Sequence, residues 1–168
     1  FYGLKKDKVD YRGVIFFGLM IKNNKPYVIE YNVRFGDPEC QTLLRDLKTD
    51  LLDIFLATIE DELSKIKISK YNMKVICVVL ASLGYPGNYQ KNKLLKNLDK
   101  VKKSNNIEVF HAGTKLVKNK FYSNGGRVLC ITARSTTLEN ARRIAYKAIK
   151  AMNWKNGFYR KDIGIKNK

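Results

Sequence analysis

The sequence is poor in the residues that form metal clusters and disulfide frameworks. Its 168 residues include 1 histidine and 3 cysteines, and the cysteines (Cys40, Cys77 and Cys130) lie far apart without a C-x-x-C pair. An odd number of widely spaced cysteines argues against a disulfide framework and against a zinc site. Cys77 and Cys130 lie in apolar segments, so we expect them to be thiols of a hydrophobic core.

Long apolar runs are also missing. No run approaches the ~20 residues that a helix needs to cross a bilayer, and no signal peptide is recognisable. We therefore predict a cytoplasmic protein with no membrane partner. The sequence opens at Phe1 without a methionine, so we expect the chain to be a fragment of a longer one.

Acidic residues are scarce. The chain has 15 of them against 33 lysines and arginines, which gives a formal net charge of +18. Such a charge favours a nucleic acid or an anionic surface as a partner, and a basic nucleic-acid-binding module is the alternative function that composition supports. The lysines, however, are scattered along the chain, and the aromatic residues lie mostly inside predicted strands rather than in a base-stacking cluster. We predict no nucleic-acid partner.

One stretch combines strand-forming residues with regularly spaced polar ones. It reads V-I-E-Y-N-V-R-F-G-D-P-E over residues 28–39, and its β-branched and aromatic residues predict a strand over residues 27–34. Because side chains alternate between the faces of a strand, Glu30, Asn32 and Arg34 are expected on one face. The opposite face carries an apolar set that should anchor the strand to a core: Ile29, Tyr31, Val33 and Phe35.

A carboxylate, a carboxamide and a guanidinium in a row suit a divalent cation held beside an anion. Magnesium prefers such oxygen ligands and keeps bonds to water and to substrate phosphates. For E-x-N-x-R alone, a solvated outer face is an equally good interpretation. The continuation favours a site, because a plain solvent-facing strand has no need of the charged turn that follows. There Gly36 breaks the strand, Asp37 suits a helix N-cap, and Pro38 suits the first helical position.

The periodicity predicts an α+β fold in two domains, residues 1–68 and residues 69–168. In the first, an apolar strand over residues 12–21, buried on both faces, forms a hairpin with residues 27–34. A helical pattern follows over residues 38–66, with a possible restart at Thr49 and Asp50. The second domain is β-rich with one packed helix. We predict a buried strand over residues 73–83 and further strands over residues 108–111, 115–122 and 126–133, the last two forming a hairpin. A helix is expected after a capping box at Thr136 and Glu139.

The single histidine, His111, lies at the end of a predicted strand in F-H-A-G-T-K. A lone histidine in such a place is usually structural. The alternative is a contact made by the second domain to the active site, possibly together with Lys115.

Six separated motifs carry a resemblance to one family. They are Y-R-G-V-I-F-F-G-L-M-I, V-I-E-Y-N-V-R-F-G-D-P-E, V-V-L-A-S-L-G-Y-P-G, F-H-A-G-T-K, N-G-G-R-V-L and Y-R-K-D-I-G, in that order. Together they resemble the phosphoribosylamine–glycine ligases, also called glycinamide ribonucleotide synthetases, of the ATP-grasp superfamily. The resemblance covers the C-terminal part of an ATP-grasp domain and the C-terminal domain of the family. Another ATP-grasp ligase or carboxylase would share E-x-N-x-R but not the motifs of the second domain.

The resemblance implies ATP-dependent joining of glycine to 5-phosphoribosylamine through glycyl phosphate. It implies that Glu30 and Asn32 bind Mg2+ or Mn2+ between the phosphates of ATP and that Arg34 stabilises the transferring phosphate. From chemistry alone, Asp37 is expected to orient glycine. ATP-grasp enzymes often carry another acidic ligand on the preceding strand, where this chain is expected to have Gly18. We also expect a monomer, or a chain packed against the N-terminal part of the same enzyme, and no ligase activity from this chain alone.

Overall fold

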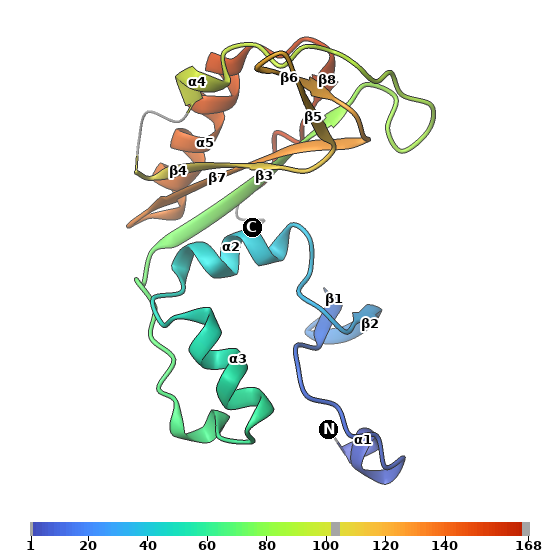
Figure 1. Ribbon diagram of the computed structural model, residues 1–168, viewed down its shortest axis with the longest axis vertical. Helices are drawn as coiled ribbons and strands as arrows, with labels where there is room; N and C mark the ends of the chain where they lie inside the picture. Colours follow the sequence, from blue (N-terminus) through green and yellow to red (C-terminus); the bar gives the residue numbers. More distant parts are fainter. Residues whose placement is uncertain (1, 102–104, 166–168) are drawn as a thin grey trace. The chain divides into compact units, whose positions relative to one another are not determined.

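The computed structural model describes residues 2–101 and 105–165 (Figure 1). The chain divides into two compact units. An N-terminal unit comprises residues 1–40 and 47–71, and a C-terminal unit comprises residues 41–46 and 72–168. Both combine helices with antiparallel strands. The α+β class expected from the sequence is therefore confirmed.

The N-terminal unit contains a two-stranded hairpin. Strands β1 (Phe16–Lys22) and β2 (Lys25–Asn32) pair antiparallel, as predicted. Asn23 and Asn24 connect them with φ values of 50° and 57°. Two consecutive positive φ values are characteristic of the tight hairpin turn that matches the twist of the strands, and asparagine tolerates them well.

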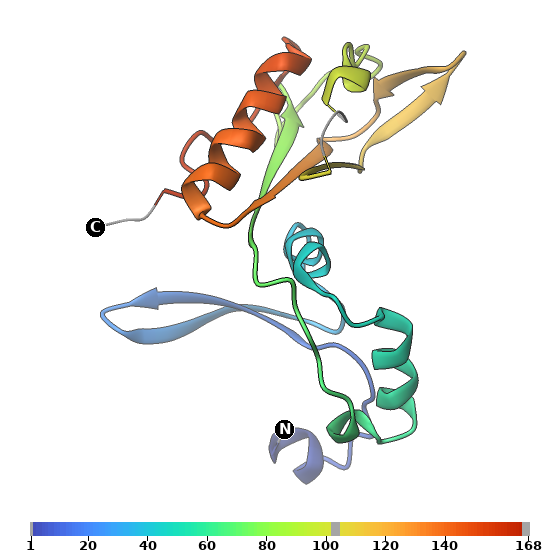
Figure 2. The same ribbon diagram turned by 90° about the vertical axis from the view of Figure 1, so that its left-hand side faces the viewer.

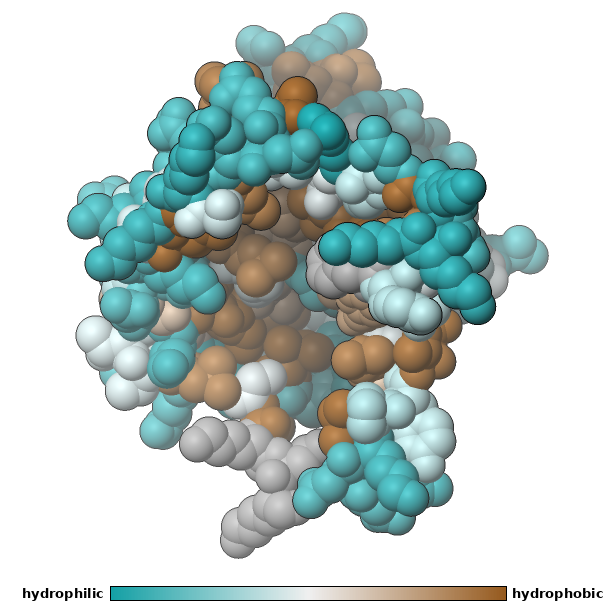
Figure 3. Space-filling view, turned by 90° about the horizontal axis from the view of Figure 1, so that it is seen from below, coloured by the Kyte–Doolittle hydropathy of each residue, from teal (hydrophilic) through white to brown (hydrophobic). Residues whose placement is uncertain are grey.

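The prediction that the first strand is buried on both faces is wrong. Met20 and Ile21 are 57% and 60% exposed, and the hairpin forms a sheet of its own with only two strands. Figure 3 shows exposed hydrophobic residues as brown patches on one face of the molecule. A continuous apolar run indicates that a strand needs cover on both sides, but no layer of the described residues provides it for this hairpin.

Short helices make up the rest of the N-terminal unit. The helical pattern of residues 38–66 breaks after α2 and restarts where predicted, because the Asp50 carboxylate accepts a hydrogen bond from the amide of Leu52 at 2.8 Å. The pattern then ends early in a 3-10 turn. Thr49 and Ser69 close the unit: the Ser69 amide donates to Thr49 Oγ1 at 2.8 Å. The helices of this part of the chain are α1 (Tyr2–Lys6), α2 (Glu39–Asp46), α3 (Leu51–Ile59) and η1 (Leu63–Lys65); α2 starts in the N-terminal unit, and its residues 41–46 belong to the C-terminal unit.

The C-terminal unit is built on a four-stranded antiparallel sheet. Its strand order is β4-β7-β3-β8, so the two long strands lie in the middle. Val78, Ile131 and Val109 stand opposite one another across three strands and are all buried. The buried strand predicted over residues 73–83 is thus confirmed. The strands are β3 (Lys74–Ser82), β4 (Ile107–His111), β7 (Arg127–Ser135) and β8 (Gly157–Phe158).

Helix α5 (Leu138–Met152) covers one face of this sheet, as Figure 2 shows. Alanines at positions 141, 145 and 148 let the helix approach the strands closely, and Ile149 and Met152 extend its buried face. The N-cap is Thr137, which accepts from the Asn140 amide at 3.2 Å, one residue after the predicted Thr136. With 15 residues α5 is shorter than a membrane span, and no helix of the described residues is long and apolar enough to cross a membrane.

The opposite face of the sheet is approached by the end of α2. Gln41 Nε2 lies 4.0 Å from the sulfur of Cys130, and Arg45 donates to the carbonyl of Asn105 at 3.3 Å. The Asp46 carboxylate accepts from the Met73 amide at 2.9 Å. Burial lowers the pKa of Arg45, and the nearby positive charge of Arg134 lowers it further. The end of α2 is thus attached to the C-terminal unit by polar contacts.

A second hairpin replaces a strand that we predicted. Residues 115–122 do not form one strand paired with residues 126–133. They fold back at Lys118 and Asn119, with φ values of 46° and 60°, into strands β5 (Thr114–Val117) and β6 (Lys120–Ser123). The segment between the two predicted strands, where the hairpin turn was expected, instead passes close to Gly113. A Cβ on Gly113 would lie 2.8 Å from the amide nitrogen of Gly125.

The C-terminal segment is fastened to α5. Arg142 donates to the carbonyl of Ile163 at 3.1 Å and also to the carbonyl of Lys161 at 2.6 Å. The hydroxyl of Tyr146 donates to the carbonyl of Arg160 at 2.7 Å. These contacts hold the Y-R-K-D-I-G motif against the helix.

Candidate functional site

The hairpin of the N-terminal unit presents Glu30 and Asn32 side by side on one face. In the strand register Glu30 pairs with Gly18, and Asn32 pairs with Phe16. Residues directly opposite in an antiparallel pair share a face, as do residues two apart on one strand. Both side chains therefore project from the same face near the end of the hairpin, and this face is the candidate site.

Gly18 makes room for the Glu30 side chain. A Cβ on Gly18 would lie only 2.8 Å from Cγ of Glu30 and 3.5 Å from its Oε1. The pairing shifts immediately after this point, so that Leu19 pairs with Val28 and Ile29 is an extra residue in β2. Such a bulge bends a strand and redirects its side chains. The expected position of Gly18 opposite Glu30 is confirmed. The Glu30 side chain occupies the space that a side chain at position 18 would need.

The prediction that Arg34 lies on the strand is wrong. Strand β2 ends at Asn32, so strand alternation no longer sets the direction of the Arg34 side chain. Its guanidinium is exposed and donates to the carbonyl of Phe35 at 2.7 Å. The structure therefore brings Glu30 and Asn32 together by strand geometry and places Arg34 in the bend that follows them.

The apolar face of the same stretch does not anchor it to a core. Ile29, Tyr31 and Val33 are 64%, 64% and 75% exposed, which contradicts the prediction. Tyr31 contacts Phe17 within the hairpin, with 5.1 Å between ring centroids, and Phe35, the fourth residue of the set, lies 6.4 Å from the ring of Phe55 in α3. The reason is the one that applies to the whole hairpin, because no second layer of described residues lies on it.

The turn after the strand is crowded around a buried glycine. A Cβ on Gly36 would lie 3.0 Å from the ring of Phe16 and would collide with the carboxylate of Glu39. Helix α2 begins at Glu39 rather than at Pro38, and the first helical hydrogen bond runs from the Cys40 amide to the Gly36 carbonyl at 2.9 Å. Glu39 is not one of the site residues predicted from the sequence. The structure places its carboxylate against the turn.

Asp37 lies close enough to Cys40 to affect its ionisation. The pKa of the Cys40 thiol is raised above its usual value, mainly because burial disfavours the thiolate and further because the negative Asp37 carboxylate repels it. Asp37 itself is exposed. The turn thus exposes one carboxylate, that of Asp37, beside a partly buried thiol.

The donor set of the hairpin face fits a hard divalent cation. It offers one carboxylate and one carboxamide oxygen, and both residues are at least partly exposed. Within residues 2–101 and 105–165 no group of three or more histidine, cysteine, aspartate or glutamate side chains could hold a metal. Two ligating side chains leave several coordination positions for water and phosphate, which is the manner in which magnesium is usually bound.

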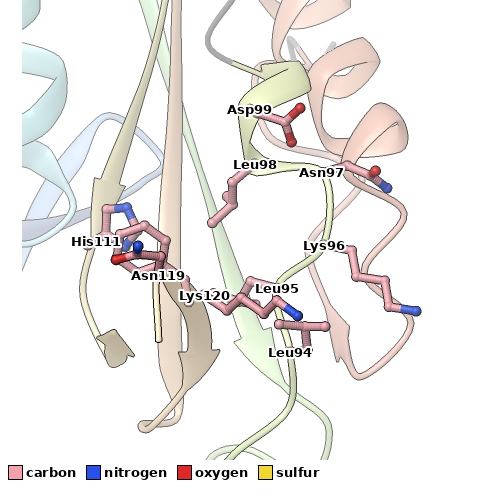
Figure 4. A pocket seen from close by; sticks show the side chains of 10 residues that line it. Leu94, Leu95, Lys96, Asn97, Leu98, Asp99, His111, Asn119 and Lys120 are labelled. Atoms are coloured by element: carbon pink, nitrogen blue, oxygen red, sulfur yellow. The ribbon is translucent and has the colours of Figure 1, made fainter. Parts of the chain in front are cut away.

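His111 belongs to a different place, in the C-terminal unit. Its Nδ1 lies 3.0 Å from the hydroxyl of Thr114, and its ring lies over Phe121 with 4.3 Å between centroids. It also lines a cavity of about 610 Å3, together with Leu98 and Asn119 (Figure 4). Lys115 is not among the lining residues. The hydrogen bond and the ring contact agree with the structural interpretation of this histidine.

Comparison with known families matches both units in the expected order. Residues 1–40 match the phosphoribosylglycinamide synthetase ATP-grasp (A) domain. Residues 75–166 match the phosphoribosylglycinamide synthetase C domain. The first match defines the class, a protein with part of an ATP-grasp domain. The second covers more than half of the chain, and the chain belongs to the phosphoribosylglycinamide synthetase family.

Individual relatives agree. The chain is 46% identical over 162 residues to the phosphoribosylamine–glycine ligase of Agrobacterium fabrum, covering 96% of this chain and 38% of the relative. It is 44% identical over 165 residues to the trifunctional purine biosynthetic protein adenosine-3 of Gallus gallus, covering 98% of this chain and 16% of that protein. The crystal structure of the ligase from Thermotoga maritima superposes with a TM-score of 0.77 at 29% identity, covering 96% of this chain and 39% of that one. The chain therefore spans well under half the length of these relatives.

Proposed function

We propose that this chain is part of a phosphoribosylamine–glycine ligase of purine biosynthesis. In the proposed reaction, the carboxylate of glycine attacks the γ-phosphate of ATP to give glycyl phosphate and ADP. The amine of 5-phosphoribosylamine then attacks the acyl carbon and releases phosphate, which leaves glycinamide ribonucleotide. Family membership supports the reaction, and the observation that carries the role of this chain is the hairpin face on which Gly18 makes room for Glu30 beside Asn32.

Glu30 and Asn32 are the residues that we propose to hold Mg2+ or Mn2+. A cation bound there would offset the negative charge of the ATP phosphates during phosphoryl transfer. Glu30 would supply the only carboxylate of the pair, because the facing position is Gly18. Asn32 would add a neutral oxygen. The protein would then offset one positive charge of the cation, and the phosphates would offset the other.

Arg34 and Asp37 are proposed to act on the reacting groups from the bend and the turn that follow the strand. The guanidinium of Arg34 has the fork geometry that binds phosphate oxygens in pairs. In the structure it bonds to a carbonyl one residue away, a contact that a phosphate could replace because the side chain is exposed. The exposed carboxylate of Asp37 suits the ammonium group of glycine.

The uncovered hairpin supports a proposal about packing. Its exposed apolar residues suit a surface that packs against the rest of the same enzyme, since the relatives are more than twice as long as this chain. We infer a monomeric enzyme in which residues 1–68 complete the ATP-grasp domain and residues 69–168 form the C-terminal domain. The cytoplasmic location, the absence of a nucleic-acid partner and the inactivity of this chain by itself stay predictions.

The test is phosphate release by the enzyme that contains this chain, assayed with glycine, 5-phosphoribosylamine and Mg-ATP. Glu30→Gln keeps the shape of the side chain and removes its charge. We expect it to lower kcat by about a hundredfold or more, since oriented charge is the main contribution of such sites, and to raise the magnesium concentration needed for half-maximal rate.

The matched control is Glu60→Gln, an exposed glutamate after α3 that lies outside the proposed site. It should leave kcat unchanged. Glycine-independent phosphate release by the wild type would reject the ligase reaction. A Glu30→Gln enzyme as active as the control would leave the reaction standing but reject the metal site on the hairpin.

A further inference from the structure

The turn after β2 packs on the same face of the hairpin as the candidate metal site. Phe16 pairs with Asn32 in the strand register, so its side chain shares a face with Asn32 and Glu30. A Cβ on Gly36 would lie 3.0 Å from the Phe16 ring, and Gly36 is buried. The ring of Phe16 therefore connects the turn to the site face.

Glu39 reaches back to this turn from the start of α2. A Cβ on Gly36 would collide with its Oε2, so the carboxylate and the ring of Phe16 share the space beside Gly36. The Cys40 amide donates the first helical hydrogen bond to the Gly36 carbonyl at 2.9 Å. Counted from that bond, Gly36 is the N-cap residue and Glu39 stands three residues later, the position from which a glutamate folds back onto the N-cap main chain. Glu39 and Phe16 thus hold the main chain of the turn.

Asp37 is the functional candidate whose direction depends on this turn. It directly follows Gly36, and its carboxylate is exposed. The pKa of the Cys40 thiol is raised by burial and then by the negative charge of Asp37, so these two groups lie close together. Cys40 therefore reports the position of the Asp37 carboxylate independently of any substrate.

Three roles of Glu39 can be separated by what they require of its side chain. A helix cap stabilises α2, mainly through a negative charge near the positive helix end, and acts on stability alone. A direct contact with a substrate or a cation also requires the charge. Holding the turn requires only an oxygen acceptor of the right reach beside Gly36, which glutamine supplies as well. The contact with Gly36 favours this third role, since it involves the turn itself.

We propose that Glu39 is a positioning residue: it holds the turn of Gly36 and Asp37 on the site face, so that the Asp37 carboxylate binds the ammonium group of glycine. The inference rests on the proposed function, because glycine binding by Asp37 is part of it. Glu39 itself does not touch glycine. Its loss should therefore weaken glycine binding and leave the steps that involve ATP intact.

The first test compares Glu39→Ala and Glu39→Gln in the enzyme that contains this chain, assayed by phosphate release. Glu39→Ala should raise KM for glycine about tenfold, because the ammonium group loses a fixed partner, with kcat and KM for ATP little changed. Glu39→Gln keeps an oxygen beside Gly36 and should restore KM for glycine to within about threefold of the wild type. The matched control is Glu139→Ala, at an exposed glutamate in the first turn of α5, which should leave KM for glycine unchanged.

The second test reads the position of Asp37 without the reaction. Alkylation of Cys40 in the same enzyme is followed at pH 8 by mass spectrometry. Glu39→Ala should let the Asp37 carboxylate move away, which lowers the pKa of the thiol and speeds alkylation about twofold, whereas Glu39→Gln should not. In an Asp37→Asn background the same alanine substitution should have no further effect, because the charge that it displaces is already gone.

Three results would overturn the inference and leave the ligase reaction in place. One is an unchanged KM for glycine in Glu39→Ala, which would reduce Glu39 to a helix cap. Another is a Glu39→Gln enzyme as impaired as Glu39→Ala, which would mean that the charge itself acts. The third is faster alkylation of Cys40 on adding Glu39→Ala to Asp37→Asn, since Glu39 would then shield the thiol rather than hold Asp37. Glycine-independent phosphate release by the wild type would instead overturn the proposed function, and the glycine role of Glu39 with it.

Discussion

Strands β1 and β3 have similar, mostly apolar sequences but differ in how far they are buried. Both come from nearly continuous apolar runs, and both were expected to be buried, the first of them on both faces. In β3, Val78 and Leu80 are almost fully buried between α5 and neighbouring strands, whereas in β1 Met20 and Ile21 are more than half exposed. The apolar run therefore predicts that a strand requires cover. It does not predict that the cover belongs to the same stretch of chain.

The two units also differ in what their polar groups do. In the C-terminal unit, polar side chains mostly satisfy main-chain groups, as Ser82 does when it donates to the Gly125 carbonyl at 2.9 Å. In the hairpin, Glu30 and Asn32 stand on an open face. A polar residue that stabilises nothing visible in its own unit is the better candidate for a ligand contact, since binding and catalytic residues concentrate outside the packed core.

The largest expected effect tests the difference in burial. Ile131→Ala in β7 removes a fully buried side chain and should lower the free energy of unfolding by about 2–5 kcal/mol. Ile29→Ala in β2 removes a side chain that is 64% exposed and should change it by no more than about 0.5 kcal/mol. Denaturant unfolding of the 168-residue chain, followed by circular dichroism, measures both. A similar loss in the two variants would show that the hairpin is covered in solution.

A smaller effect is expected from filling the space at Gly18. In Gly18→Ala the new methyl group would lie 2.8 Å from Cγ of Glu30, so the carboxylate must move. Because small displacements of catalytic groups are costly, we expect kcat of the whole enzyme to fall about tenfold, with stability nearly unchanged. Gly3→Ala is the control, since nothing lies within 4 Å of the position of its Cβ. Equal kcat values for the two alanine variants would contradict the arrangement of Glu30.

The smallest effect concerns the reactivity of Cys40. Its raised pKa leaves little thiolate at pH 8, so alkylation should be slow and should accelerate as the pH rises through the pKa. Asp37→Asn removes the repulsion of the thiolate and lowers the pKa, so the rate at pH 8 should increase about two- to threefold. Burial, the larger cause, remains. Mass spectrometry of the modified peptides measures the rate, with buried Cys77 and Cys130 as unreactive internal references.

Local features of the fold could be predicted because their causes lie within a few residues. The hairpin follows from two apolar segments around Asn23 and Asn24, and the restart of the helix follows from the capping group of Asp50. The facing of Gly18 and Glu30 follows from the hairpin register. These features depend on turn chemistry and side-chain periodicity, which a single sequence contains.

Other features depend on partners that local patterns do not reveal. The β5–β6 hairpin turns at Lys118 and Asn119, where no glycine marks the reversal. Arg34 lies outside the strand because β2 ends at Asn32, although E-x-N-x-R continues the alternation. The buried indole nitrogen of Trp154 could not be foreseen, since it results from a fold that encloses the atom and offers it no acceptor among the described residues.

The hydrogen bonds between α5 and the C-terminal segment affect which positions of the sequence can be substituted. Arg142 and Tyr146 hold the segment through the carbonyls of residues 160, 161 and 163. Every residue type supplies the same carbonyl, so these contacts impose little selection on the side chains of the segment. The hydrogen bonds instead impose selection on the helix residues that donate them. The attachment through these carbonyls depends on an arginine and a tyrosine one helical turn apart, whereas Tyr159 and Ile163 are constrained separately, because they pack against the core.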